Sequence, residues 1–592
     1  MRLKSVKILG KNFRSLTANK LYEFKHSFRE DRLSTKIFAG LNGSGKSNFL
    51  ELYSEIFYFL EICHLETVPQ SEKENKDFGF EIEYYLPKTK EGIKKIFAKD
   101  FQEVVETYIK NNLPLTKYTR EEFEKNYYLE IEKLETEEVE KVSNQLLKDG
   151  YAHIRIVKPQ GAATEYNFIR QDEIKDPRNV TDNTQEVLPT KVIAYTSGQN
   201  ELLSNPYYKL KYHYFKTFED KKKLDVELAE NHRLFFLDYS TNFSIFVANI
   251  LLADKKKATL LKDVLQLNDL QSFRITLNTD DLYKKVIPVN EKLADNLEKL
   301  KLCSTCWIEK TVGEKKLLIL DYLINDEMKD AFEYHFTNAF TLFKLFYELE
   351  IFNLYLVDKP TRDLMLQVHK SYNFSDEMPK PEPSRLVFRI EKIYISKKID
   401  ESKPPKNIYY KALSDGEHQF NEVVGTILMM EQEGCLFLID EPDTHFNPKW
   451  RAKLIKMLNH MAAISFNADG NIEKVRKQEV IITTHSPFVI SDSSSEDVYR
   501  FVKDKGMIAF DNPIIQMYGA DISIILEEIF EKEETISDMA KKELKDMVEN
   551  ITTMDELRKV VDRMNTEFGD SATKFDLFSK LKSIKEEIEK KK

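Results

Sequence analysis

The chain contains few glycines, and three of its 17 lie within one stretch of six residues. Together with the two residues that follow, this cluster has P-loop spacing and consists of Gly40, Gly43, Gly45, Lys46 and Ser47. An apolar run typical of a buried strand precedes it at residues 36–39, and apolar residues recur at helical spacing after it. A glycine-rich turn between a strand and a helix lets backbone N–H groups converge on phosphate oxygens. The cluster therefore predicts an α/β fold with a nucleotide site at this turn.

Side chains in the same stretch supply the matching chemistry. Lys46 is expected to contact the β- and γ-phosphates of ATP, and Ser47 to ligate Mg²⁺. Asn42 and Asn48 flank these residues and belong to the predicted binding loop. A chance Lys-Ser pair after a glycine-rich turn is the alternative, and the strand and helix on either side argue against it.

Length and composition limit which classes of protein the chain can belong to. With 592 residues, of which 42% are hydrophobic and 32% charged, the chain is expected to form several lobes with substantial cores. Four cysteines and a start without an apolar leader predict a cytoplasmic protein without a disulfide scaffold. The net charge of −10 means that any nucleic-acid contact needs a local basic patch. The most apolar stretch, 234–254, carries Asp238, Asn242 and Asn249, which predicts a buried helix rather than a membrane span.

A second motif supplies the acidic groups that a P-loop requires. The apolar residues 435–439 lead directly into Asp440 and Glu441, as in a buried parallel strand that ends at the ligand-binding edge of a sheet. Asp440 is expected to hold Mg²⁺, and Glu441 to act as general base toward the attacking water. A plain strand end with two carboxylates is the alternative, and the neighbouring motifs argue against it.

Two further motifs lie on either side of this strand. Residues 413–417 read Leu-Ser-Asp-Gly-Glu, and a later apolar strand ends at His485. The order of the four motifs resembles that of the ABC-type ATPase head, in particular its SMC, RecF and OLD-like branch. The resemblance implies that His485 is the switch histidine and that residues 413–417 are the signature. The signature departs from the transporter pattern at Asp415 and Glu417, changes that this branch tolerates.

The resemblance also implies roles for residues outside the strongest motifs. It implies that Ser414 and Gly416 face the γ-phosphate bound by a second copy. The segment Asn-Phe-Arg-Ser resembles the entry strand of the branch, which implies that Arg14 faces phosphate. Gln199 follows a strand predicted at 191–195, and the resemblance implies that it senses Mg²⁺ and γ-phosphate. A solvent-facing loop glutamine is the alternative for Gln199.

The expected fold class is α/β: an ABC-type P-loop ATPase head, in which a mixed or parallel sheet and an antiparallel lobe carry compact helical insertions. No sustained heptads occur between residues 199 and 414, so the larger insertion is expected to be a compact, mostly helical domain rather than a coiled-coil arm. The expected divisions are the N-terminal lobe of the head at 1–95, a helical insertion at 96–150, head strands and the glutamine loop at 151–205, the large insertion at 206–384, the C-terminal lobe at 385–515 and a helical tail at 516–592.

A Cys-x-x-Cys pair, Cys303 and Cys306, lies near the middle of the larger insertion. Some SMC-like proteins place a zinc hook at this position, where two copies would contribute four thiolates to one zinc ion. No coiled coil flanks the pair, and Trp307 with Ile308 indicates a buried strand. Core cysteines are therefore the preferred interpretation, and zinc is not expected.

The residues after His485 contain no Asp-x-Asp pair for a Toprim nuclease, and no HNH motif occurs in the chain. Glu391-Lys392 is only a weak match to a restriction-type nuclease. The layout of an ATPase without its own nuclease resembles the restriction-system-associated and retron-associated ATPases of bacterial defence, most closely the PtuA family of Septu systems. This resemblance implies ATP and Mg²⁺ as cofactors, a homodimer or higher homo-oligomer, and a separately encoded HNH nuclease (PtuB-like) as partner. It also implies an antiviral role, with DNA or a retron nucleic acid as a further candidate partner and no membrane.

Two alternative functions stay open on sequence grounds. One is a RecF-like or SMC-like DNA-repair ATPase that binds DNA directly. The other is a regulatory scaffold that binds ATP and hardly hydrolyses it.

Overall fold

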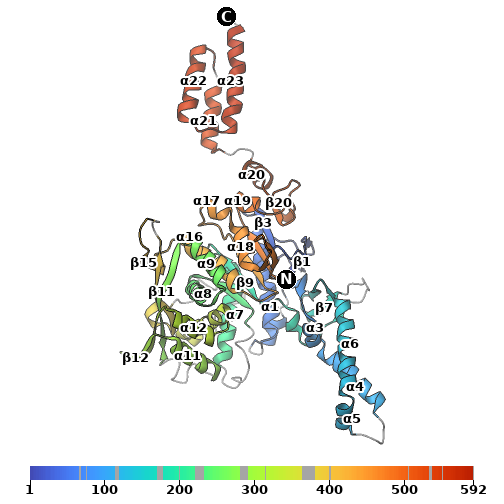
Figure 1. The fold of residues 1–592 in the computed structure, drawn as a ribbon. Helices are drawn as coiled ribbons and strands as arrows, with labels where there is room; N and C mark the ends of the chain where they lie inside the picture. Colours follow the sequence, from blue (N-terminus) through green and yellow to red (C-terminus); the bar gives the residue numbers. More distant parts are fainter. Residues whose placement is uncertain are drawn as a thin grey trace.

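The computed structural model describes residues 1–65, 68–74, 77–113, 119–169, 178–198, 200–219, 232–279, 291–313, 315–362, 381–398, 402–504, 506–532, 536–549 and 551–590. A central head carries three projecting parts (Figure 1). The helices α4 (Ala98–Asn112), α5 (Arg120–Asn126) and α6 (Tyr128–Leu146) project at the lower right. The larger insertion lies at the lower left, and the C-terminal helices stand apart from the head at the top.

The head is built on a predominantly parallel sheet with the strand order β10-β9-β16-β19-β3-β20-β21, in which the last strand is antiparallel. β16 and β19 are buried at every position, as expected for parallel strands covered on both faces. Helix α1 (Lys46–Ile62) packs against β3, β16 and β19, and α7 (Glu201–Glu219) packs beside α1. The strands are β3 (Ser34–Gly40), β9 (Val192–Thr196), β10 (Leu234–Leu237), β16 (Leu436–Asp440), β19 (Glu479–Thr483), β20 (Val498–Asp504) and β21 (Met507–Asp511).

A second, antiparallel sheet has the order β2-β1-β4-β6-β7-β8, with the short β5 paired to β6. Along β4 and β6, buried residues alternate with more exposed ones, the pattern of a sheet that covers the core with one face. The predicted antiparallel lobe is therefore confirmed. Its strands are β1 (Arg2–Leu9), β2 (Leu21–Glu23), β4 (Gly79–Pro87), β5 (Leu147–Lys148), β6 (Tyr151–Lys158), β7 (Glu165–Ile169) and β8 (Arg178–Asn179).

Buried charges join the two sheets. Glu479, at the start of β19, lies 3.5 Å from Lys36 Nζ on β3, and both side chains are buried. The Glu479 carboxylate also accepts hydrogen bonds from Leu3 N on β1 at 2.6 Å and from Ser34 Oγ at 3.1 Å. One carboxylate thus connects the first strand of the antiparallel sheet to two strands of the parallel sheet.

The larger insertion contains an antiparallel sheet with the order β12-β13-β11-β14-β15 in addition to its helices. The prediction of a mostly helical insertion missed this sheet, and the predicted boundary at residue 384 divides it. β14 and β15 were placed in the C-terminal lobe, but β14 pairs with β11 of the insertion. β11 and β14 lie far apart in the sequence, and the local periodicity of one strand does not indicate which strand it pairs with. The strands are β11 (Leu267–Asn278), β12 (Cys306–Val312), β13 (Lys315–Leu323), β14 (Phe388–Lys397) and β15 (Lys406–Tyr409).

The Cys-x-x-Cys pair is divided between two environments. Cys303 is buried at the end of α11 (Glu291–Cys303), whereas Cys306 is exposed at the start of β12. All of β12 is exposed, and the Trp307 side chain has an exposed fraction of 52%. The interpretation of both residues as core cysteines next to a buried strand is therefore wrong for Cys306. The aromatic and β-branched residues indicated a strand correctly but not its burial.

Helix α8 (Tyr239–Leu252) forms most of the stretch predicted to be a buried helix. It packs along α16 (Asp415–Met429) of the head and along α13 (Ala339–Ile351) of the insertion. In the part of the chain that the structure describes, no helix combines the length and apolar character needed to cross a membrane.

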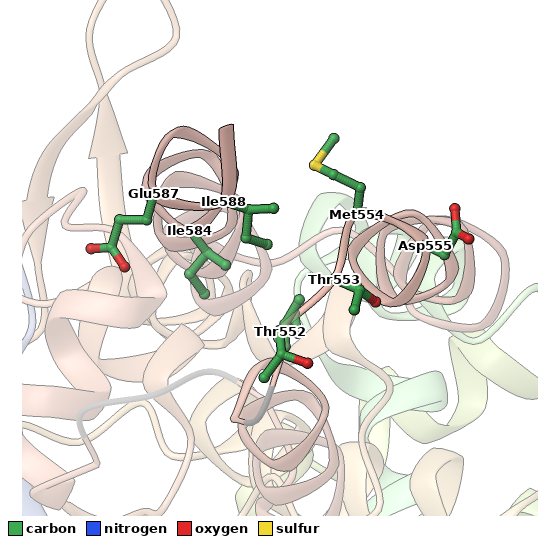
Figure 2. Close-up of a pocket in the computed structure, with 8 residues that line it drawn as sticks. Thr552, Thr553, Met554, Asp555, Ile584, Glu587 and Ile588 are labelled. Carbon is green, nitrogen blue, oxygen red and sulfur yellow. The ribbon is translucent and has the colours of Figure 1, made fainter. Parts of the chain in front are cut away.

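The C-terminal helices form a bundle of their own. α21 (Asp538–Val548), α22 (Met554–Glu567) and α23 (Ala572–Lys590) share a small core separate from that of the head, made of Leu544, Val548, Met564, Leu577 and Leu581. A capping box formed by Thr553 and Glu556 starts α22. A cavity of about 480 Å³ lies between the start of α22 and the end of α23 (Figure 2).

We predict that Lys36→Ala destabilises the head strongly. The substitution leaves the Glu479 carboxylate buried without its cation, and breaking a buried ion pair in this way costs about 3–5 kcal/mol. Arg29→Ala is the matched control, because Arg29 and Asp31 form an exposed pair worth about 0–1 kcal/mol. Melting temperature, followed by intrinsic fluorescence, compares the two variants. Equal melting temperatures would show that the buried Lys36–Glu479 pair does not stabilise the head.

Candidate nucleotide-binding site

The predicted P-loop connects β3 to α1, and its glycines have backbone conformations that other residues rarely adopt. Gly40, Gly43 and Gly45 have φ angles of 139°, 75° and 92°. A Cβ on Gly45 would lie 1.9 Å from Ile508 Cδ1, and a Cβ on Gly40 would lie 2.5 Å from the Phe501 carbonyl oxygen. At Gly43 a Cβ would have nothing within 4 Å. The β20–β21 hairpin therefore closes one side of the loop, while the side at Gly43 is open.

Donors for an anion gather at this loop. Lys46 is buried and donates to the carbonyl oxygens of Gly40 and Leu41, both at 3.0 Å. Burial lowers the pKa of Lys46 to about 8, against the opposing effect of Glu441 and Asp440. Among the residues that the structure describes, no side chain caps the start of α1, and the buried hydroxyl of Ser44 has no hydrogen-bond partner. A helix start without a cap, an ammonium group and an unsatisfied hydroxyl fit a polyphosphate.

Asp440, at the end of β16, accepts hydrogen bonds from four side chains. Its Oδ1 accepts from Ser47 Oγ at 2.9 Å and from Thr483 Oγ1 at 2.6 Å. Its Oδ2 accepts from Thr196 Oγ1 at 3.3 Å and from Asn200 Nδ2 at 3.2 Å. We call these five residues the Asp440 cluster. Its carboxylate and the adjacent hydroxyl of Ser47 are hard oxygen ligands of the kind that Mg²⁺ prefers, so the donor set fits this ion.

Sequence reasoning identified Ser47 and Asp440 but missed the other members of the Asp440 cluster. Thr483 was visible as the last residue of the strand before His485, and Asn200 as the neighbour of Gln199. Thr196 directly follows the strand predicted at 191–195 and is the last residue of β9. Gln199 itself lies outside the described residues, so its predicted role stays a prediction.

Glu441 and His485 lie together beside the Asp440 cluster. Glu441 has a positive φ of 51°, and its N–H donates to the Thr483 carbonyl at 3.1 Å. Its Oε1 lies 3.5 Å from His485 Nε2, and both side chains are partly exposed. Burial, and next the charge of Asp440, raise the pKa of Glu441. Burial and the charge of Lys46 lower the pKa of His485 to about 4, so the imidazole is neutral at pH 7.

Arg14 and Asn48 lie against the first turns of α1. Arg14 has a φ of 54°, and its Nε lies 3.3 Å from the Glu51 carboxylate. Asn48 Nδ2 donates to the hydroxyl of Ser15, which follows Arg14 in the chain. Burial raises the pKa of Glu51 to about 7, although Arg14 opposes this shift. The structure thus places Arg14 beside the P-loop helix, paired with a glutamate that sequence reasoning missed.

The signature residues form the start of α16. Ser414 is its N-cap and forms a capping box with Glu417; its hydroxyl donates to Glu417 Oε2 at 2.9 Å. A Cβ on Gly416 would lie 2.6 Å from the His445 carbonyl oxygen, so this position requires glycine where the loop after β16 passes. In the described residues, no hydrogen bond or ion pair joins Ser414 to the P-loop of its own chain. The structure therefore gathers the P-loop, Asp440, Glu441 and His485 but not the signature.

The strand order explains this grouping. β19 lies between β3 and β16, so the residues after all three strands meet at one sheet edge. With its antiparallel lobe and its signature helix, this arrangement defines the head as an ABC-type P-loop ATPase head. The fold class predicted from the sequence is thereby confirmed.

Comparisons with known proteins agree with this class. Residues 315–491, which include the signature, Asp440 and His485, match the family described as "AAA domain, putative AbiEii toxin, Type IV TA system". The chain is similar to the Septu protein PtuA of Bacillus thuringiensis, with 28% identity over 164 residues, which cover 27% of this chain and 35% of that protein. It is also similar to protein ea59 of Escherichia phage lambda, with 22% identity over 185 residues, which cover 30% of this chain and 33% of that protein. The chain thus spans about a third of the length of these relatives.

Among solved structures, the Smc head domain of Pyrococcus furiosus, with an extended coiled coil and bound to the C-terminal domain of ScpA, aligns over 89% of this chain and 99% of that chain. The identity is 11% and the TM-score is 0.28. A second SMC head, bound to the C-terminal winged-helix domain of ScpA, aligns over 86% of this chain and 98% of that chain, with 10% identity and a TM-score of 0.29. TM-scores this low do not define a fold. The ABC-type class is defined by the strand order and by the geometry of the site.

We predict that Lys46→Ala and Glu441→Gln separate binding from turnover. Lys46→Ala removes a charge-assisted phosphate contact and should weaken nucleotide affinity by about tenfold or more. Glu441→Gln keeps the size of the side chain but removes the base, and should lower kcat by about 10²–10⁴-fold with affinity retained. Titration with a fluorescent ATP analogue and steady-state phosphate release measure the two effects. Wild-type turnover by Glu441→Gln would show that another group is the base.

Proposed function

We propose that the chain binds ATP with Mg²⁺ and hydrolyses it slowly. The observation that carries this proposal is the contact between Ser47 and Asp440 at 2.9 Å below a glycine loop rich in donors. Glu441 and His485 lie at the same sheet edge, where the terminal phosphate of a nucleotide on the P-loop would end. Mg²⁺ held by Ser47, Asp440 and Gln199 would neutralise charge on the β- and γ-phosphates.

Different side chains of the site bind the phosphates, accept the proton of the water and contact the γ-phosphate. Lys46 binds the phosphates once it exchanges its contacts with the loop carbonyls for phosphate oxygens. The Glu441 carboxylate accepts the proton of the attacking water, and its raised pKa brings it closer to working pH. The neutral imidazole of His485 can donate one hydrogen bond toward the γ-phosphate while it lies near Glu441. Arg14 adds a second cation if it leaves Glu51.

We further propose that two copies pair head-to-tail and share their sites. Ser414 lies on α16, away from the P-loop of its own chain, and its hydroxyl already bonds Glu417. A second copy would present this serine, with the free N–H groups at the start of α16, to the γ-phosphate. Each closed site would then take its P-loop from one copy and its signature from the other.

Mixing two inactive variants tests the sharing of sites. In a heterodimer of Lys46→Ala and Ser414→Arg chains, both lesions fall in one site and the other site is intact. We predict partial recovery of ATPase activity, toward a quarter of the wild-type rate for random pairing of equal amounts with independent sites. Phosphate release by the mixture, compared with each variant alone, gives the answer. No recovery, with heterodimers confirmed by native mass spectrometry, would contradict the shared site.

We also propose a partner and a biological role. The similarity to the Septu protein PtuA supports a role in anti-phage defence, in which the nucleotide state of the head controls a separate HNH nuclease. The C-terminal bundle and the insertion offer surface for such a partner, since Met539 and Phe575 of the bundle have exposed fractions of 81% and 60%. A closed and an open head would differ in the surface that they present.

We predict that nuclease affinity depends on nucleotide state. The neighbouring HNH protein would be titrated against wild-type and Lys46→Ala chains, with and without ATP. Linkage requires that ATP change the affinity for wild type and leave it unchanged for Lys46→Ala. A chain truncated after residue 532 tests the bundle, because the bundle has its own core and the head keeps its own. Equal affinity and nuclease activity in every state would exclude the coupling.

The same measurements separate the alternative functions. A DNA-repair ATPase would bind DNA with high affinity and show turnover without any nuclease. A regulatory scaffold would bind ATP with negligible turnover, and Glu441→Gln would then leave its behaviour unchanged.

A further inference from the structure

Helix α8 is apolar, yet two of its asparagines, Asn242 and Asn249, are completely buried. Burying an amide is costly unless its hydrogen bonds are replaced. Both residues lie on the side of α8 that packs along α16, the helix that starts at the signature. Neither residue has a part in the proposed nucleotide chemistry, so their placement needs another explanation.

Both the oxygen and the nitrogen of the Asn242 side-chain amide form hydrogen bonds. Its Oδ1 accepts from Tyr410 OH at 2.6 Å and from Asn421 Nδ2 at 3.3 Å. Its Nδ2 donates to the His418 carbonyl at 2.9 Å. The Asn242 carbonyl oxygen accepts a further bond from Asn421 Nδ2 at 3.1 Å.

The partners of Asn242 lie on both sides of the signature serine. Tyr410 comes four positions before Ser414, and His418 comes four positions after it. The Tyr410 ring is completely buried, stacks on Phe246 of α8 at 4.2 Å and meets the His418 ring edge-on at 5.0 Å. The Asn242 side chain therefore contacts the segment before the signature, through Tyr410, and the first turn of α16 after it, through His418.

The same first turns of α16 also reach the catalytic strand end. Gln419 donates to Tyr195 OH on β9 at 3.1 Å and accepts from His445 N at 3.0 Å. His445 belongs to the loop that follows Glu441, and the His445 carbonyl oxygen lies against Gly416. A shift of α16 relative to α8 would thus displace the signature and the loop after Glu441 together.

We infer that Asn242 is a positioning residue for Ser414, and that α8 is the element through which the insertion sets the place of the signature. α8 is continuous with the insertion through its packing on α13, whereas α16 belongs to the head. The inference rests on the proposed function, because Ser414 meets a nucleotide only in the shared site. It adds a route by which a partner bound to the insertion alters hydrolysis without touching the nucleotide.

Tyr410→Phe is the sharpest test, since it removes one hydroxyl and keeps the ring that stacks on Phe246. Asn249→Ala is the matched control: Asn249 also bonds α16, through the Gly425 carbonyl at 2.8 Å, but far from Ser414 along the helix. We expect Tyr410→Phe to lower kcat by about fivefold, the effect of one lost hydrogen bond, with the Kd for ATP unchanged. Asn242→Ala should lower kcat further, and Asn249→Ala should leave both constants at the wild-type level.

Parallel measurement of melting temperature excludes a purely structural effect. The inference is overturned if Tyr410→Phe and Asn249→Ala, at similar melting temperatures, have the same kcat, or if Tyr410→Phe changes Kd and kcat equally. Ser414→Arg, assayed in parallel, separates the proposed role of Asn242 from the proposed shared site. Loss of turnover in Ser414→Arg with normal turnover in Tyr410→Phe rejects only the role of Asn242. Normal turnover in Ser414→Arg rejects the shared site, and the role of Asn242 with it.

Discussion

The nucleotide edge of the head depends on a single carboxylate, that of Asp440. Four side chains donate to it, from the P-loop helix, from the ends of β9 and β19, and from the start of α7. The residue is buried, and the surrounding donors supply the hydrogen bonds that its carboxylate would otherwise form with water. These bonds fix the ends of three parallel strands and the first turn of α1 relative to one another. The site is therefore organised before a nucleotide arrives, and a metal ion would replace hydrogen bonds already aimed at its ligands.

The head is held together by segments that lie far apart in the sequence. The P-loop glycines lie against Ile508 and Phe501, so the hairpin after β19 forms the wall of a loop near the N-terminus. Glu479 bonds Leu3 across 476 positions of sequence. The insertions between the head strands can vary in size as long as their ends return to the head. This explains how one fold accommodates insertions as different as the α4–α6 projection and the sheet-containing domain.

The parts that the sequence predicted are those whose signal is local. The P-loop and the strand before Asp440 each combine an apolar pattern with functional side chains only a few positions away. The antiparallel sheet of the insertion was missed because β11 pairs with β14 across a long separation, and neither strand reports its partner. Cys306 was misplaced because aromatic and β-branched residues indicate a strand but not which strands reach the edge. Glu51 and Asn200 were missed because their importance arises from neighbours that only the fold supplies.

Buried polar contacts also set the position of the compact insertion relative to the head. Two apolar helices packed side by side can slide or rotate at small cost, because dispersion contacts are many and unspecific. Asn242 changes this, since its amide finds donors and acceptors at only one register of α8 against α16, and any other register leaves several buried groups unpaired. The contact between insertion and head therefore has one well-defined position. A partner that forces a second position must supply enough binding energy to break it, and the signature would move with α16 when it does.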